Sequence, residues 1–135
     1  MMLSLALFHI VGPVPMELGV HEGALAVCPM PAHCARADWH EQQLSGDTPQ
    51  RSLERLVPVI EAISGTKIVE QNGSYLHATA TSALFGFVDD LELYADTQNG
   101  ILQARSVSRL GDSDLGVNSK RLEFLRQALG RNPKA

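Results

Sequence analysis

The spacing of apolar and polar residues divides the chain into an irregular part followed by a regular one. Between residues 12 and 48, Pro and Gly recur too often for a long element, and we expect only a short extended piece near residues 39–44. Thr48 and Pro49 are typical of a helix start. Apolar residues at helical spacing then predict one buried stripe, made of Leu53, Leu56, Val57, Ile60 and Ile63. Pro58 predicts a kink in this helix, and Gly65 predicts its end.

Four extended segments follow, at residues 66–70, 74–82, 84–96 and 100–109. Asn72 and Gly73 lie between the first two and predict a hairpin. In the third segment the apolar side chains share a face with Asp89, so either a β-bulge turns Asp89 away or it is a semi-buried carboxylate with a partner. The fourth segment places small side chains on one face, namely Leu102, Ala104, Ser106 and Ser108. Its other face carries Ile101, Gln103, Arg105, Val107 and Arg109.

A last helix is expected to begin near Asn118 and to end at Gly130. Its predicted apolar side consists of Val117, Arg121, Phe124, Leu125, Ala128 and Leu129. The order of elements predicts an α+β fold, with a four- to five-stranded antiparallel sheet, two helices on one face and the other face free. This order resembles the TATA-binding-protein-like fold, with the helix-grip fold as the alternative. We expect an apolar N-terminal segment over residues 1–18 and a single α+β domain over 19–135.

Composition narrows the class of partner. The chain of 135 residues has few aromatic residues (5%), which predicts an aliphatic core, and a net charge of −4 without a basic cluster. Nucleic-acid-binding proteins usually carry such a cluster, so we expect no nucleic-acid partner. Residues 1–11 are apolar but too short to span a membrane, which takes about 20 apolar residues, and they show no clear secretory signal. We expect them to pack on the domain or to face a membrane or a protein partner.

The two cysteines allow several interpretations. Cys28 and Cys34 could form a disulfide that closes a seven-residue loop, worth roughly 2–2.5 kcal/mol. They could instead remain reduced, act as redox thiols, or bind a metal together with His33 and with His40 or His21, although the spacing matches no usual zinc pattern. We favour the disulfide, which is typical of a periplasmic or membrane-associated location, whereas reduced cysteines would indicate the cytoplasm. No cofactor is predicted.

Charged and amide side chains gather where the last predicted strand leads into the last helix. The candidate ligand-binding residues are Asp89, Asp90, Arg105, Arg109, Asp112, Asp114 and Asn118. If the third and fourth segments pair as a hairpin through a turn at residues 97–100, Asp89 or Asp90 can lie near Arg105 to Arg109. One interpretation is an anion or polar-ligand pocket in which Arg109 forks onto a carboxylate or phosphate, helped by N–H groups at the helix start. The other is an internal ion-pair network that ties the loop to the sheet, with Asp114 and Asn118 as turn and cap residues. We favour the second, because such side chains most often satisfy backbone groups.

Catalytic motifs are not evident in the sequence. It contains no Gly-x-Ser-x-Gly elbow and no phosphate-binding glycine loop. Two aspartates beside two arginines would stay ionised, which suits a proton donor poorly. His77 stands alone on a polar strand face, and we expect it to be solvated rather than catalytic. The sequence therefore favours a protein that is not an enzyme.

Three stretches resemble one known family. Residues 19–25 lead into Cys-Pro-Met-Pro-Ala-His-Cys at 28–34, which is similar to that family's Cys-Pro-x-x-Pro-Asn-Cys. Phe-Val-Asp-Asp at 87–90 resembles its central strand, and Ser-Arg-Leu-Gly-Asp-Ser-Asp-Leu-Gly-Val-Asn at 108–118 its most specific motif. On these residues, the chain from about 19 to 129 is identified as a member of domain-of-unknown-function family 1499, whose bacterial and plastid members are uncharacterised and often carry hydrophobic N-terminal segments.

The resemblance implies a shared fold and a shared site but no reaction. His33 stands where the family usually has Asn, and Asp112 where it usually has an aromatic residue. Our first functional hypothesis is a non-enzymatic binding or accessory protein of an envelope or membrane complex, which contacts its partner or a membrane surface through residues 1–18. The alternative is a small-ligand (anion) binding protein or an enzyme, with a site at Arg105, Arg109, Asp112 and Asp114.

Overall fold

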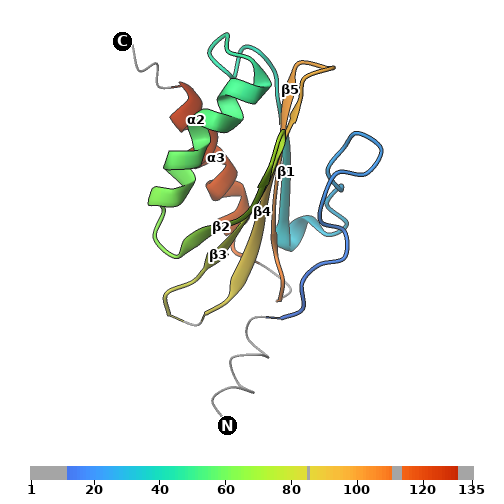
Figure 1. Ribbon diagram of the computed structural model, residues 1–135. Helices are drawn as coiled ribbons and strands as arrows, with labels where there is room; N and C mark the ends of the chain where they lie inside the picture. Colours follow the sequence, from blue (N-terminus) through green and yellow to red (C-terminus); the bar gives the residue numbers. More distant parts are fainter. Residues whose placement is uncertain (1–11, 85, 111–113, 131–135) are drawn as a thin grey trace.

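Two helices cover one face of a five-stranded antiparallel sheet in the computed structural model, which describes residues 12–84, 86–110 and 114–130 (Figure 1). The elements are η1 (Pro31–His33), β1 (Cys34–Trp39), α2 (Pro49–Ala62), β2 (Thr66–Asn72), β3 (Tyr75–Thr81), β4 (Val88–Asp96), β5 (Ile101–Ser108) and α3 (Val117–Gly130). The strand order across the sheet is β1-β5-β4-β3-β2. The predicted fold class is therefore confirmed. Within the described ranges, no helix has the length and apolar character that crossing a membrane requires.

Two strand positions differ from those predicted. The early strand β1 is Cys34–Trp39, not residues 39–44, because its backbone pairs with β5 and the chain then turns over residues 41–46. Strand β4 begins at Val88 rather than at residue 84. A closed loop precedes it, since the N–H of Ser82 donates to the Phe87 carbonyl at 2.8 Å and the Ser82 hydroxyl accepts the N–H of Phe87 at 3.0 Å.

Helix α2 begins as predicted, with the Thr48 hydroxyl accepting the N–H of Arg51 at 3.2 Å. The helix continues through Pro58 and ends at Ala62. Gly65 follows with a φ of +74°, and a Cβ atom there would lie 2.4 Å from the carbonyl oxygen of Thr81. Glycine is therefore required at this position both by conformation and by the close approach of β3.

The core between the sheet and the helices is aliphatic, as the low aromatic content predicted. Its fully buried members come from α2, from the strands and from α3, and include Leu53, Leu56, Ile60, Leu91, Leu93, Leu102 and Leu125. The buried side of α3 differs from the predicted one. Leu122 is buried, whereas Val117 and Phe124 are 43% and 46% exposed. The displaced residues face a groove instead of the core.

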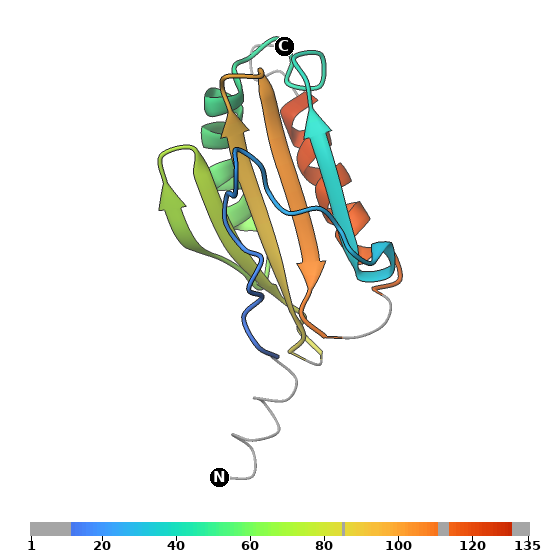
Figure 2. The same cartoon turned by 90° about the vertical axis from the view of Figure 1, so that its right-hand side faces the viewer.

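The second face of the sheet is not free, which corrects our expectation. Residues 12–30 cross it (Figure 2), and their backbone bonds to polar side chains that rise from the strands. The N–H of Gly19 donates to Glu92 Oε2 at 2.6 Å, and the N–H of Leu25 donates to Gln103 Oε1 at 2.9 Å. A disulfide between Cys28 and Cys34 links this segment to the start of β1. Both faces of the sheet are therefore covered. The helices cover the apolar side chains of the strands, and residues 12–30 cover polar ones.

Candidate ligand-binding site

The sheet divides the predicted cluster of charged residues between its two faces. Neighbouring residues of a strand point to opposite faces, so Asp89 lies on the helix side of β4 and Asp90 on the other side. Asp89 pairs with Arg121 of α3 at 3.0 Å, whereas Asp90 pairs with Arg109 at 2.8 Å. The strand pairing of β4 continues without a shift through both residues. Of the two expectations for Asp89, the partnered carboxylate is confirmed and the bulge is not found.

Asp90 is the centre of the polar cluster on the second face. Arg109 donates to both of its carboxylate oxygens, at 2.8 and 3.0 Å, and His77 Nε2 lies 2.7 Å from Oδ1. Burial by itself would raise the pKa of Asp90, but the hydrogen bonds from His77 and Arg109 outweigh it and hold the pKa below its usual value. Hydrogen bonding to Asp90 in turn raises the pKa of Arg109. His77 is buried beside this pair, not solvated as we expected.

Arg105 has different acidic partners from those we predicted. It is fully buried, with Nη1 3.4 Å from Glu92 Oε1 and Nη2 3.2 Å from Glu17 Oε1. Tyr75 donates its hydroxyl hydrogen to the other Glu92 oxygen at 2.6 Å, and burial together with this carboxylate raises the pKa of Tyr75. Sequence analysis missed Glu92, although its register opposite Arg105 was available from the predicted β4–β5 hairpin.

On the helix side, Asn118 joins the last loop to the sheet. Its Nδ2 donates to Asp114 Oδ2 at 2.6 Å, to Ser108 Oγ at 2.9 Å and to the His33 carbonyl at 3.1 Å. Its Oδ1 accepts a hydrogen bond from Ser106 at 2.6 Å. These contacts agree with the second interpretation of the sequence, in which side chains of the loop attach it to the sheet. Asp112, the remaining predicted member, lies outside the described residues.

Asp114 acts on the start of α3. Its carboxylate accepts the N–H of Gly116 at 2.7 Å and the N–H of Asn118 at 3.3 Å. Burial alone would raise the pKa of Asp114, but the hydrogen bonds from the Asn118 side chain and from these backbone groups lower it. The backbone N–H of Asp114 also donates to the Ala32 carbonyl at 2.9 Å, so the loop is attached to the segment that precedes β1.

The cysteines form the disulfide that we favoured, and this leaves neither sulfur as a thiolate ligand for a metal. The histidines that we considered beside them do not converge. His40 is exposed, and the ring of His21 lies 3.1 Å from the Leu18 carbonyl. Within the part of the chain that the structure describes, no group of three or more His, Cys, Asp or Glu side chains could hold a metal ion.

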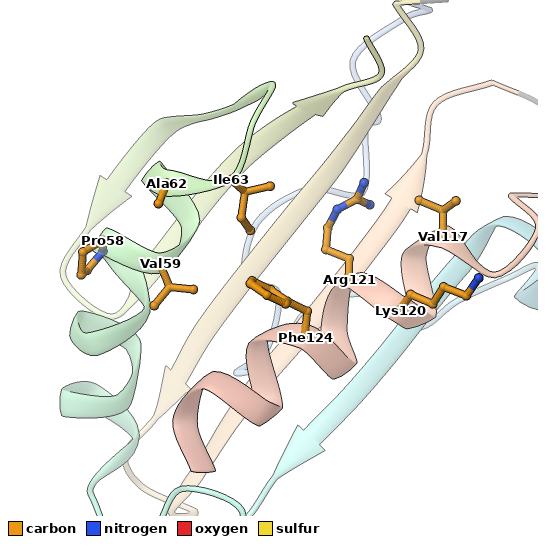
Figure 3. A pocket seen from close by; sticks show the side chains of 8 residues that line it. All are labelled: Pro58, Val59, Ala62, Ile63, Val117, Lys120, Arg121 and Phe124. Atoms are coloured by element: carbon orange, nitrogen blue, oxygen red, sulfur yellow. The ribbon is translucent and has the colours of Figure 1, made fainter. Parts of the chain in front are cut away.

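An open apolar groove of about 780 Å³ lies between α2 and α3 (Figure 3). Val59 of α2, and Ile63 directly after the helix, point toward Phe124 of α3 across it. The full lining is Pro58, Val59, Ala62, Ile63, Val117, Lys120, Arg121 and Phe124. Sequence analysis missed this groove, because it assigned the apolar side chains of both helices to the core.

A more polar pocket of about 650 Å³ continues the groove toward the end of the sheet. The groove and the pocket share three lining residues, Ile63, Val117 and Arg121. Asp89, Ser108, Asp114 and Thr66 add polar groups to the pocket, and Phe87, Leu110 and Leu115 form part of its rim. We call the two together the inter-helix cleft.

Arg121 stands where the apolar and polar parts of the cleft meet. Its Nη1 makes three contacts, with Asp89 at 3.0 Å, Ser106 at 3.0 Å and Asn118 at 2.9 Å. Among the described residues, the hydrogen bonds that Arg121 donates come from Nη1 and none comes from Nε or Nη2. The hydroxyl of Thr66, on the wall of the same pocket, is buried without a hydrogen-bond partner. The cleft therefore presents unused polar groups beside an apolar channel.

The fold and the cleft define a small α+β domain with a ligand-sized groove between its two helices. The sequence model of the DUF1499 family, proteins of unknown function, matches residues 25–129, and the chain belongs to this family. No curated protein and no solved structure matches the chain. The likeness to the TATA-binding-protein-like fold, or to the helix-grip fold, thus stays a prediction.

Proposed function

We propose that the protein is a non-enzymatic binding protein that holds the apolar part of an amphipathic small molecule in the inter-helix cleft. The observation that carries the proposal is Arg121, which places unused N–H donors at the inner end of an apolar groove. Ligand pockets of proteins usually enclose about 300–1,000 Å³, are mostly apolar and contain a few polar groups that orient the ligand. The groove, of about 780 Å³, and the polar pocket, of about 650 Å³, each lie in this range, and apolar residues form most of the groove lining.

The polar end of the cleft indicates the chemistry of the head group. Asp89 already neutralises Arg121, so the site offers hydrogen-bond donors rather than a free positive charge. A carboxylic acid, alcohol or carbonyl group would accept hydrogen bonds from Nε and Nη2, while an acyl or similar chain would contact Val59 and Phe124. A long-chain fatty acid is the simplest molecule of this class.

The location of the protein is part of the same proposal. A disulfide that connects the covering segment to β1 favours an oxidising compartment. An apolar segment over residues 1–18 favours work at an envelope or membrane surface, where amphipathic ligands are concentrated. We therefore place the protein at such a surface as an accessory binding protein.

The alternative function, an anion site or enzyme centred on Arg105 and Arg109, has less support. Both guanidinium groups already hold carboxylates, Arg105 those of Glu92 and Glu17 and Arg109 that of Asp90. An anionic ligand would have to displace a buried or half-buried acid, which leaves that acid uncompensated.

Binding of cis-parinaric acid, a naturally fluorescent fatty acid, tests the proposed function. The wild-type chain should bind it with saturation. Ala62→Phe places a ring at an exposed position of the groove wall and should weaken binding at least about tenfold. Glu61→Phe adds the same ring one position away, outside the lining, and should bind as the wild type does. Equal melting temperatures would show that both variants are folded. Absence of saturable binding to the wild type, or equal binding by both variants, would contradict the proposal.

A further inference from the structure

One end of the molecule exposes apolar side chains around the mouth of the inter-helix cleft. They belong to the loop between β3 and β4, to the loop between β5 and α3, and to the first residue of α3. These side chains are Leu84 (81% exposed), Phe87 (46%), Leu110 (37%), Leu115 (87%) and Val117 (43%). All but Leu84 also line the polar pocket of the cleft. We call these five residues the apolar rim. Single exposed apolar residues are ordinary, but a group around a pocket mouth marks an interaction site.

Leu115 is held in an unfavourable conformation for a leucine. Its φ is +54°, in the left-handed region that residues with a Cβ seldom adopt. An asparagine or aspartate would adopt this conformation more readily and would be better solvated. The sequence instead keeps a large apolar side chain there and exposes most of it. An exposed leucine at position 115 is unfavourable for an isolated monomer in water, but it is favourable if the rim enters an apolar medium.

The N-terminal chain meets the rim at the same end of the molecule. The described chain begins at Gly12, where a Cβ atom would lie 2.9 Å from Leu110 Cγ and 3.3 Å from Arg109 Cβ. Figure 2 shows this point beside the end of β5 and the loop that precedes β4. The eleven residues that precede Gly12 are apolar except for Ser4 and His9. The chain therefore enters the described structure beside Leu110, after an apolar stretch of sequence.

We propose that the apolar rim is a membrane-docking surface, and that the cleft receives its amphipathic ligand from the bilayer on which the rim rests. The delivery of a ligand from the bilayer rests on the proposed function of the cleft, whereas the docking of the rim does not. The apolar residues that precede Gly12 in the sequence would contribute to attachment beside the rim. Stable attachment to a bilayer usually needs a second contribution, which the loops of the rim supply. The cleft mouth would then open at the level of the lipid head groups.

The charges near the rim indicate what kind of membrane it contacts. Arg109 and Arg121 are paired with Asp90 and Asp89, and the chain as a whole carries a net charge of −4. An attraction to anionic lipid needs a cluster of unpaired cations. Docking therefore depends on apolar contact, and we expect the protein to bind zwitterionic vesicles with little dependence on salt.

Sedimentation of the full-length chain with phosphatidylcholine vesicles tests the docking surface. The double variant Leu84→Asp/Leu115→Asp should lower the partition coefficient at least about tenfold. The control Val27→Asp/Val69→Asp introduces the same charges at apolar positions of 76% and 47% exposure outside the rim, and should partition as the wild type does. Raising the salt concentration from about 0.1 to 0.5 M, which shortens the screening length about twofold, should change wild-type binding less than about twofold.

Three outcomes would overturn the proposal. Wild-type protein that stays in the supernatant, or equal partition of the rim variant and the control, would show that the rim does not dock on lipid. Concentration-dependent dimerisation that the rim variant alone abolishes would assign the rim to a second copy of the chain. Binding of cis-parinaric acid without vesicles separates the two proposals when it is measured on the single variant Leu84→Asp, because Leu84 is the rim residue outside the lining of the cleft. Weaker vesicle binding with retained parinarate binding is the expected result for this variant. If wild-type parinarate binding fails while vesicle binding persists, the cleft function is refuted and the docking surface remains.

Discussion

Replacing Arg109 with methionine separates a structural role of this residue from ligand binding. Its guanidinium donates to both oxygens of Asp90, which is fully buried. Methionine keeps much of the aliphatic volume, but it leaves the carboxylate with His77 as its remaining side-chain partner. Removing one member of a buried ion pair costs about 3–5 kcal/mol. At pH 8 we therefore expect Arg109→Met to lose about that much free energy of unfolding, a fall in melting temperature of roughly 10–20 °C.

The loss should depend on pH in a direction that the structure determines. Burial raises the pKa of Asp90, and the hydrogen bonds from His77 and Arg109 lower it. Removal of Arg109 should therefore shift the pKa of Asp90 upward, and the cost of the buried carboxylate is smaller at low pH, where the carboxyl group is protonated, than at high pH. The variant should thus lose less stability at pH 5.5 than at pH 8, by about 1 kcal/mol, which is somewhat less than one pKa unit of differential interaction. Wild-type protein already has Arg109 on this carboxylate, so the effect belongs to the variant.

Urea unfolding at both pH values, with unchanged slopes, provides the measurement. The double variant Arg109→Met/Asp90→Asn is the control, because it leaves no unpaired charge and should recover most of the lost stability. A loss below about 1 kcal/mol at pH 8, the same loss at both pH values, or a double variant as unstable as the single one would refute the reasoning. In that event Arg109 would not be a structural partner of Asp90, and the alternative, that Arg109 binds a ligand, would be favoured.

Four further expectations concern the rest of the structure. Replacing Cys28 and Cys34 by alanine should lower the free energy of unfolding by about 2 kcal/mol under oxidising conditions, measured against wild type with and without reductant. Asn118→Ala should cost at least about 2 kcal/mol in urea unfolding, because it strands several polar partners of a fully buried side chain. Gly65→Ala should cost more than about 1 kcal/mol, since its Cβ would lie 2.4 Å from a carbonyl oxygen of β3; a neutral effect would contradict this. Because hydrogen bonds lower the pKa of Asp90, its contribution is present above about pH 4 and should be lost on further acidification, in an acid titration followed by circular dichroism that Asp90→Asn makes shallower.

The sequence predicted the regular elements well, because their periodicity is local. The hairpin at Asn72 and Gly73, the cap at Thr48 and the two faces of β5 all follow from spacing within a few residues, and each is found in the structure. The extra strand was harder to place. Strand β1 is short and has Ala35 and Ala37 in it, so its position depends on pairing with β5 rather than on its own pattern.

The polar contacts were only partly predictable, for a reason of the same kind. Cross-strand register predicted that Asp89 or Asp90 would meet an arginine, and Arg109 does meet Asp90. The partner of Asp89 is Arg121, which comes from a helix, and no local pattern reveals which turn of a helix faces a strand. The covering of the second face was missed because residues 12–30 have no regular pattern and dock through backbone N–H groups, as Gly19 does.

The strand order also determines the stage of synthesis at which the sheet can be completed. Strands β2 to β5 pair with their neighbours in the chain, but β1 must wait for β5, since Cys34 lies opposite Val107. The ribosome must therefore synthesise strands β2 to β5 before β1 can pair with β5, and contacts of such long range form late. During that interval the two thiols, only six positions apart, are uncovered. In the oxidising compartment that we propose, an oxidant would join them before the sheet closes, and the covering segment would then reach the sheet already as a loop.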